Sequence, residues 1–262
     1  LFLTRSWSDR AIGVAAVVLL LQPVEWYHYI ANLINPAHRL PDLKVAEMYG
    51  EVADYTKAGN WRDFLLGNVT LGQKASFLWA VNAGRFVQTA GLFLLGFFIG
   101  RKQLFMTNEK NIVFWTKVLI ISAISFAPLY TLKELVMEND PIVQQTVGTA
   151  FDMWQKLAFT LVLVASFILL YQHKNFSKAV AGLRFYGKMS LTNYISQSII
   201  GAFIYFPIGL NLAPYCGYTL SLSVGFLIFL LQLKFCKWWL ARHKQGPLEY
   251  IWHKCTWIGT GK

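Results

Sequence analysis

Long apolar stretches separated by shorter polar loops dominate this chain of 262 residues. Six stretches are long enough to cross a bilayer, because a spanning helix needs ~20 mostly apolar residues. They cover residues 11–30, 78–100, 112–132, 151–171, 189–209 and 217–240. Every backbone polar group in lipid must be hydrogen-bonded within the protein. The pattern therefore predicts an all-α fold, a polytopic membrane helical bundle with about six transmembrane helices, and we treat residues 1–262 as a single membrane domain.

Composition agrees with a membrane protein, because only 14% of the residues are charged. The net charge of +11 does not point to nucleic acid. The basic residues lie beside the ends of the apolar segments, where positive-inside topology accounts for them. The expected partner is the lipid bilayer. The three cysteines show no paired spacing, so the sequence predicts neither a metal site nor a disulfide framework.

Basic residues fill alternate loops. They occur at 5–10, 101–110, 174–188 and 237–262, whereas the loops between these are neutral, acidic or uncharged. Because positive loops stay in the cytoplasm, this alternation predicts that both termini are cytoplasmic and that three loops face outward.

Two segments outside the spans also have helical patterns. In the long outer loop, apolar residues recur at helical spacing from Val45 to Tyr55, and Asn60 can cap a second short helix, which together predict an outer helical hairpin. After the last span, Pro247 can begin a helix that carries Glu249 in its first turn, where the helix dipole favours a carboxylate. Aromatic and basic neighbours make this a C-terminal amphipathic interfacial helix.

Polar residues at membrane depth are costly, so they are the best indicators of a functional site. Arg85 and Gln88 lie near the outer end of the second span. Arg85 has three interpretations: a charge that snorkels to the surface, half of an ion pair with Glu25, or a contact to an anion or carbonyl in an outward-open cavity. We take Arg85 and Gln88 as candidate substrate-binding residues. On the same segment, Gly96-x-x-x-Gly100 is a spacing that suits close helix packing.

A second polar group opens the fifth span. Ser190, Asn193 and Gln197 are three and four residues apart, so they share one helix face, with Tyr194 beside them. We expect this stripe to face the bundle interior. Asn193, Tyr194 and Gln197 complete the candidate substrate-binding set, and interhelical hydrogen bonding is the alternative explanation.

Two C-terminal motifs carry a family resemblance. GKMSLTNYISQS begins at Gly187, and WW-x3-H-x2-GPLEYIWHKCTW runs from Trp238 to Trp257. They resemble the bacterial family catalogued as domain of unknown function 418, also called YeiB-like, of which this chain corresponds to the C-terminal module. The segments 84–105 and 48–64 fit the same family. Departures from its pattern are Lys188, Tyr250 and His253, which stand where the family usually has Arg, Trp and Arg.

The resemblance implies a function as well as a fold. The family is distantly similar to transmembrane acyltransferases, which implies a bacterial inner-membrane protein that modifies an extracytoplasmic envelope or glycan acceptor from an acyl-CoA donor. No cofactor is evident in the sequence itself. Family members usually carry an N-terminal membrane half with an Asp-x-x-Arg-Gly motif, which is absent here, so that half is an expected partner and the catalytic residues stay unassigned. His28 is the one weak histidine candidate.

Two other function classes stay open. One is a transporter or lipid-handling protein whose polar path runs through the second and fifth spans. The other is a scaffold that only packs against a catalytic half. The sequence alone leaves it open whether the protein is an enzyme.

Overall fold

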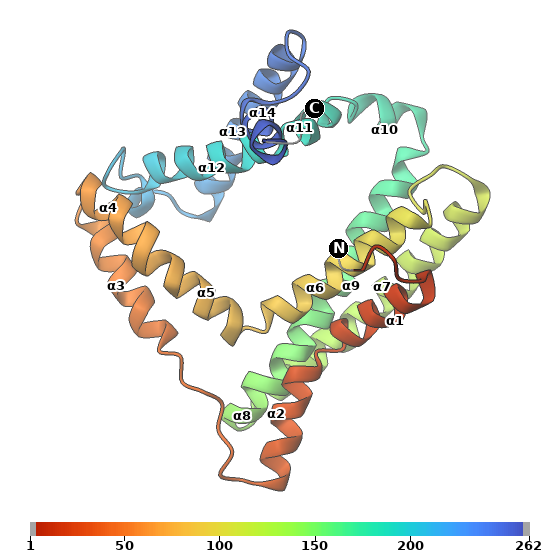
Figure 1. Ribbon diagram of the computed structural model, residues 1–262, viewed down its shortest axis with the longest axis vertical. Coiled ribbons are helices and arrows are strands. Elements are labelled where there is room, and N and C mark those ends of the chain that lie inside the picture. The colour runs from red at the N-terminus through yellow and green to blue at the C-terminus, as the bar shows by residue number, and fades with distance from the viewer. Residues whose placement is uncertain (1–3, 259–262) are drawn as a thin grey trace. The chain divides into compact units, whose positions relative to one another are not determined.

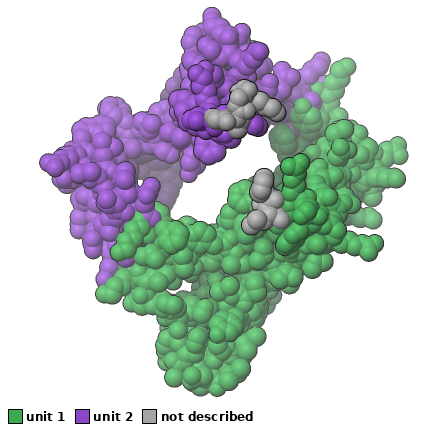
Figure 2. All heavy atoms as spheres, viewed as in Figure 1, with its two compact units in different colours: residues 1–45, 74–174 green, residues 46–73, 175–262 purple. Residues whose placement is uncertain are grey.

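The computed structural model describes residues 4–258, and these form helices joined by turns and loops, without a β-strand (Figure 1). The predicted all-α fold is confirmed. The chain divides into two compact units, drawn in different colours in Figure 2. Unit 1 contains residues 1–45 and 74–174, and unit 2 contains residues 46–73 and 175–262. The single-domain organisation stays a prediction.

Unit 1 is built on two pairs of neighbouring helices. Its helices are α1 (Asp9–Leu20), α2 (Pro23–Ile34), α5 (Gln73–Asn82), α6 (Arg85–Arg101), α7 (Glu109–Met137), α8 (Pro141–Val143), the π-helix η2 (Gln144–Gly148) and α9 (Thr149–Tyr171). Helix α1 packs along α6, and α7 packs along α9 (Figure 1). Ile12, Ala16 and Leu94 form the buried centre of the first pair.

Unit 2 contains shorter helices and one long one. They are α3 (Val45–Lys57), α4 (Trp61–Gly67), the π-helix η1 (Asn68–Gly72), α10 (Lys174–Ala179), α11 (Leu183–Lys188), α12 (Ser190–Tyr205), the 3-10 turn η3 (Ala213–Tyr215), α13 (Tyr218–Leu240) and α14 (Pro247–Thr256). Asn60 caps α4, as predicted, by accepting a hydrogen bond from the backbone N–H of Arg62 at 2.9 Å. That α3 and α4 lie on the outer surface stays a prediction.

Three helices among the described residues are long and apolar enough to cross a membrane. They are Glu109–Met137, Pro141–Tyr171 and Tyr218–Leu240. Only 11%, 17% and 11% of the residues in their most apolar windows are buried inside the protein. A soluble protein would bury these apolar side chains, whereas lipid is a suitable environment for them. The length, composition and exposure of these helices are therefore compatible with a membrane protein.

The predicted count of six spans is not confirmed. Two further spans exist only if a bent pair of helices counts as one: α1 with α2, bent by 48°, and Trp61–Asn82 with α6, bent by 76°. That makes at most five candidates in the described residues. The stretch at 189–209 forms α12, which has 16 residues and ends at Tyr205, before Pro207. It is shorter than the ~20 residues that a full crossing needs.

The first bend follows from Pro23. The residue before a proline is disfavoured in the α-helical region, and Gln22 adopts the left-handed region at φ 60°. The bend leaves the carbonyl of Leu20 without its usual helical donor, and the indole Nε1 of Trp154 on α9 donates to that oxygen at 2.8 Å. An apolar segment that looks continuous in sequence is thus two helices, and the backbone carbonyl freed at the break between them has a hydrogen-bond donor.

The second bend lies at a glycine. Gly84 adopts φ +61°, which suits a residue without a Cβ, and α6 begins directly after it. A different glycine, Gly91, allows close packing of α6, because an added Cβ there would lie 2.9 Å from Leu20. Nothing lies within 4 Å of such an atom at Gly96 or Gly100. The expectation that these two glycines pack a helix is therefore wrong within the described residues.

The predicted cytoplasmic location of the termini is not tested. Residues 1–3 and 259–262, which form the ends of the chain, lie outside the described residues. The orientation of the chain in the membrane stays a prediction from the distribution of basic residues.

Candidate functional site

The two helix breaks of unit 1 lie next to each other. Glu25, in the first turn of α2, is only 5% exposed. Its Oε1 atom lies so close to Gly84 that a Cβ built there would be 2.6 Å away from it. The methyl group of Met153 on α9 would lie 3.3 Å from the same Cβ. Polar backbone and a buried carboxyl group therefore meet inside an apolar part of the chain, an arrangement that membrane proteins use at ligand sites.

Arg85 lies immediately after this break, at the start of α6. Its Nη1 atom donates to Oε1 of Gln88 at 2.8 Å, and its guanidinium lies 5.6 Å from the ring centroid of Trp79. Its Nε atom is buried and has no hydrogen-bond partner. The two predicted residues Arg85 and Gln88 are thus in contact, and the arginine keeps a donor available.

The ion pairs of the described residues do not include one between Glu25 and Arg85. The structural-pair interpretation of Arg85 is therefore not supported. Simple snorkelling does not fit well either, because the guanidinium is held by Gln88 and Trp79 rather than extended into water. Gln22 adds a second unsatisfied donor at the break, since it is 1% exposed and its Nε2 atom has no partner.

Unit 2 contains a separate polar network between α11, α12 and α13. The amide Nε2 of Gln197 donates to the hydroxyl of Tyr186 at 2.6 Å and to Oε1 of Gln232 at 3.0 Å. The Tyr186 hydroxyl donates to the same Gln232 oxygen at 3.1 Å. Nε2 of Gln232 donates to the hydroxyl of Ser196 at 2.9 Å. These groups satisfy each other, as polar side chains on facing membrane helices do.

Asn193 belongs to the same network. It is 2% exposed, its Nδ2 donates to the carbonyl of Tyr186 at 3.0 Å, and its amide lies 3.3 Å from Sγ of Cys236. Tyr194 does not belong to it, because its side chain is 70% exposed. The expectation that Tyr194 faces the interior is wrong: it lies 100° of helix beyond Asn193, and the buried face extends the other way, to Thr192, which is 8% exposed. Ser190 is also exposed.

Glu249 connects the two C-terminal motifs. Its Oε1 accepts from the backbone N–H groups of Leu191 and Thr192 at 2.8 and 3.1 Å, and its Oε2 accepts from the Thr192 hydroxyl at 2.5 Å. These backbone groups belong to the first turn of α12, which has no intrahelical acceptors for them. Glu249 therefore caps a helix that begins 59 residues before it. The prediction that it serves the dipole of its own helix missed this partner.

The hydrogen bonds also set the charge state of Glu249. Burial would raise the pKa of its carboxyl group, but donation from the Thr192 hydroxyl and from nearby backbone N–H groups outweighs that effect and lowers the pKa. Gly246 is needed beside it, because a Cβ there would collide with the Glu249 carboxylate and the Thr192 hydroxyl. The motif GPLE thus provides both the carboxylate and the space for it.

The five predicted substrate-binding residues form two groups in different units. Arg85 and Gln88 belong to unit 1, and Asn193, Tyr194 and Gln197 belong to unit 2. Sequence reasoning missed Tyr186, Gln232 and Cys236 as members of the second group. Gln232 could have been recognised from the sequence, because it is a polar amide side chain in the middle of the last apolar span.

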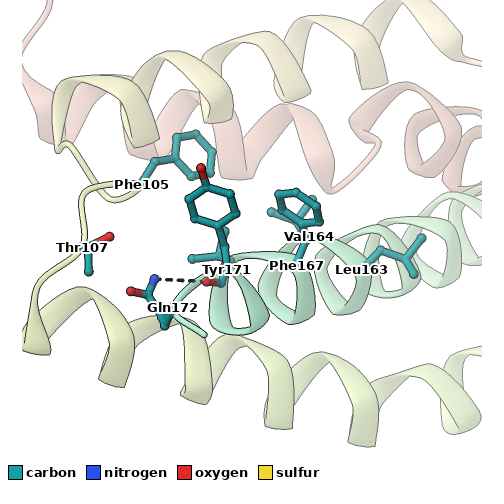
Figure 3. A pocket seen from close by; sticks show the side chains of 8 residues that line it. Phe105, Thr107, Leu163, Val164, Phe167, Tyr171 and Gln172 are labelled. Carbon is teal, nitrogen blue, oxygen red and sulfur yellow. Dashed lines mark hydrogen bonds between the residues drawn. The ribbon is translucent and has the colours of Figure 1, made fainter. Parts of the chain in front are cut away.

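Unit 1 also has an apolar groove beside the end of α9. It has a volume of about 580 Å³ and is lined by residues that include Phe105, Leu163, Phe167 and Tyr171 (Figure 3). Polar groups in its lining are Thr107, the hydroxyl of Tyr171 and Gln172, whose Nε2 donates to the Ile168 carbonyl at 3.1 Å. Such a groove suits an acyl chain better than a polar substrate.

His28 and His38 contact each other through Nδ1 and Nε2 at 3.0 Å, a pairing that the sequence did not predict. No carboxylate completes a catalytic arrangement with them among the hydrogen bonds of the described residues. Across residues 4–258, no group of three His, Cys, Asp or Glu side chains could hold a metal ion.

Comparison with known proteins identifies relatives without an assigned activity. An uncharacterized protein, YxaH of Bacillus subtilis (strain 168), is 25% identical over 95 residues, which are 36% of this chain and 24% of that protein. An uncharacterized 39.9 kDa protein in the amylase 3'region of Bacillus acidopullulyticus is 37% identical over 91 residues, which are 34% of this chain and 25% of that protein. These matches each span about a quarter of the relative's length. No solved structure matches.

The two motifs joined by Glu249 both lie within the region that a family model matches. That model is described as protein of unknown function (DUF418) and matches residues 99–259, more than half of the chain. The chain belongs to the DUF418 family, as the sequence motifs indicated.

Proposed function

We propose that this chain is a module of an acyltransferase-like protein in the bacterial inner membrane, and that it binds a carbonyl- or phosphate-bearing ligand at the break before α6. The observation that carries the proposal is Arg85, a guanidinium at a helix N-terminus with a buried Nε that has no protein partner. Buried donors are nearly always paired, so an unpaired one at a helix break is suited to a ligand.

The chemistry of the break fits a ligand with an electron-rich oxygen. A guanidinium has a planar fork of donors that matches a carboxylate, a phosphate or a polarised carbonyl. The first N–H groups of α6 add a partial positive charge from the helix dipole. The guanidinium and the helix N-terminus would together stabilise an oxygen atom that gains negative charge during acyl transfer.

Acyl transfer itself rests on the family resemblance. In that reaction an acceptor hydroxyl loses its proton, its oxygen forms the new ester bond, the thioester C–S bond breaks, and the coenzyme A thiolate takes up a proton. We assign ligand binding to this chain and the catalytic base to an N-terminal membrane half of the protein. The acceptor is an envelope or glycan molecule outside the cytoplasm, and both ends of this chain lie in the cytoplasm.

The experiment uses the full-length protein in nanodiscs, with acetyl-CoA as donor and an envelope polysaccharide preparation as acceptor. We expect free coenzyme A thiol and acetylated acceptor to form in equal amounts. Arg85→Ala should reduce both by about 10-fold or more, because a hydrogen bond to a charged group is worth ~1.5–3 kcal/mol. A folded wild-type protein that produces neither product would contradict the acyltransferase proposal.

A transporter or lipid-handling protein is the second candidate. Two observations favour it: both bent helix pairs belong to apolar segments, as in carriers with discontinuous helices, and an apolar groove lies beside α9. Reconstituted vesicles separate the two functions, because a transporter moves its substrate without covalent change. Mass spectrometry of the recovered substrate would show an added acyl group only for the enzyme.

A further inference from the structure

Glu25 is a buried carboxyl group that the proposed function does not use. It is 5% exposed, and none of the hydrogen bonds or ion pairs of the described residues involves its side chain. Moving an ionised carboxylate into an apolar environment without a partner costs far more free energy than protonating it. A buried acid in such surroundings is therefore neutral.

Charged groups on the neighbouring elements do not compensate Glu25. Arg85 of α6 is held by Gln88 and Trp79, and Asp152 of α9 pairs with Lys133 at 3.3 Å and with Lys156 at 2.5 Å. On α1, the charged residues Asp9 and Arg10 lie at the end of the helix that is far in sequence from the bend.

The remaining elements around α2 carry even less charge. Residues 141–148, which form α8 and η2 and pack against α2, contain no titratable side chain. On α2 itself, His28 is engaged with His38, and neither of the tyrosines beside it is a basic side chain. No neighbour among the described residues thus supplies a counter-charge to an ionised Glu25.

Glu25 lies where its protonation state can affect the contact between the two helix breaks. Its oxygen lies against Gly84, where α5 ends and α6 begins, and Gln22, with its unpaired amide, forms the other break three residues before it. We propose that Glu25 is a proton-binding site at the junction of the two helix breaks, occupied in the conformation described here and emptied when water or a cationic group reaches the junction. In membrane proteins, carboxyl groups at such positions take up and release protons during function.

This inference does not depend on acyl transfer. A neutral Glu25 allows α2 and the start of α6 to lie in contact within an apolar region. An ionised Glu25 would require water or a cation there and would separate them. The proton is therefore expected to stabilise the closed arrangement of the two bends.

The first test is chemical labelling of the full-length protein in nanodiscs with dicyclohexylcarbodiimide, an apolar reagent that reacts with protonated carboxyl groups. Mass spectrometry should find Glu25 modified several-fold more than Glu109, which is exposed at the start of α7. Labelling of Glu25 should fall as the pH is raised into the alkaline range. Equal labelling of the two residues, or none at Glu25, would overturn the proposal.

The second test is the melting temperature of Glu25→Gln, a neutral side chain of the same shape as the protonated acid. We expect it to melt at the wild-type temperature at neutral pH and to keep that temperature at alkaline pH, where the wild-type protein should melt lower. Glu109→Gln is the matched control and should retain the wild-type pH dependence. If Glu25→Gln instead melts well below wild type at neutral pH, the carboxyl group is ionised in the folded protein and the proposal is wrong.

Discussion

At the scale of single residues, Glu249 shows most clearly how one side chain can organise a motif. It accepts two backbone N–H groups and one hydroxyl from the start of α12. Glu249→Ala should leave these donors without an acceptor and lower the free energy of unfolding by ~2 kcal/mol, since a buried group left unsatisfied costs ~1–3 kcal/mol. Thermal unfolding of the purified protein measures the change. Glu51→Ala, at an exposed position on α3, is the control and should be neutral.

The same residue predicts how stability depends on pH. The pKa of Glu249 is lower in the folded protein than its ordinary value, so folding favours the ionised form. Its contribution should be complete at neutral pH and should be lost as the pH falls from the ordinary carboxyl range through the lowered pKa. Glu249→Gln should be less stable at neutral pH and should lose this part of the acid dependence. Identical acid profiles for the two proteins would contradict the assignment.

The residue scale also shows what sequence spacing can and cannot predict. Spacing of three and four residues correctly grouped Asn193 with Gln197, because helix geometry alone brings them together. It could not find Gln232 or Tyr186, which are 35 and 11 residues away from Gln197, because those contacts depend on how helices pack. Tyr194 was grouped wrongly because sequence spacing does not show where a buried face ends.

At the scale of helices, the two breaks in unit 1 determine where polar groups can lie. Gly84→Ala should destabilise the protein, because the left-handed conformation costs a residue with a Cβ ~1–2 kcal/mol and the new methyl group would meet Glu25. Gly96→Ala on the same helix should be neutral or slightly stabilising, since nothing lies within 4 Å of the added atom. The melting temperatures of these two variants test the break directly. Equal effects would argue that Gly84 is an ordinary helical position.

The network between α11, α12 and α13 makes a further prediction. Asn193→Leu, Gln197→Leu and Gln232→Leu should each lower folded yield or melting temperature more than Ile195→Leu, because each removes hydrogen bonds that join α12 to α11 or α13. Interhelical hydrogen bonds in membranes are worth ~0.6–2 kcal/mol each. Equal tolerance of all four substitutions would show that the network contributes little.

Helix breaks were the least predictable feature at this scale. Apolar composition identified α7, α9 and α13 because each is one continuous run. It did not reveal the bends within 11–30 and 78–100, because a bend does not interrupt the apolar pattern. Pro23 and Gly84 were visible in the sequence, but membrane helices often contain such residues without breaking. The bend depends on whether a neighbour such as Trp154 can satisfy the freed backbone group.

At the scale of the whole molecule, the alternating basic loops predict the orientation of the chain in the membrane. The test uses Asn60→Cys and Lys178→Cys in a protein whose Cys216 and Cys255 are replaced by serine, with the buried Cys236 retained. A membrane-impermeant thiol reagent should label position 60 in intact cells and position 178 only after permeabilisation. The reverse pattern would contradict the predicted topology.

The central claim is that Arg85 contacts a ligand through the fork of its guanidinium, and Arg85→Lys tests it most directly. Lysine keeps the charge but loses the fork. The measurement is complementation of a deletion strain by the full-length protein, with a melting curve of the same variant in detergent. Arg101→Lys, at the other end of α6, is the matched control, because a lysine there can still pair with Asp9, which Arg101 contacts at 3.1 Å. We predict that Arg85→Lys fails to complement and melts like the wild-type protein, whereas Arg101→Lys complements fully. Full complementation by Arg85→Lys would contradict the claim.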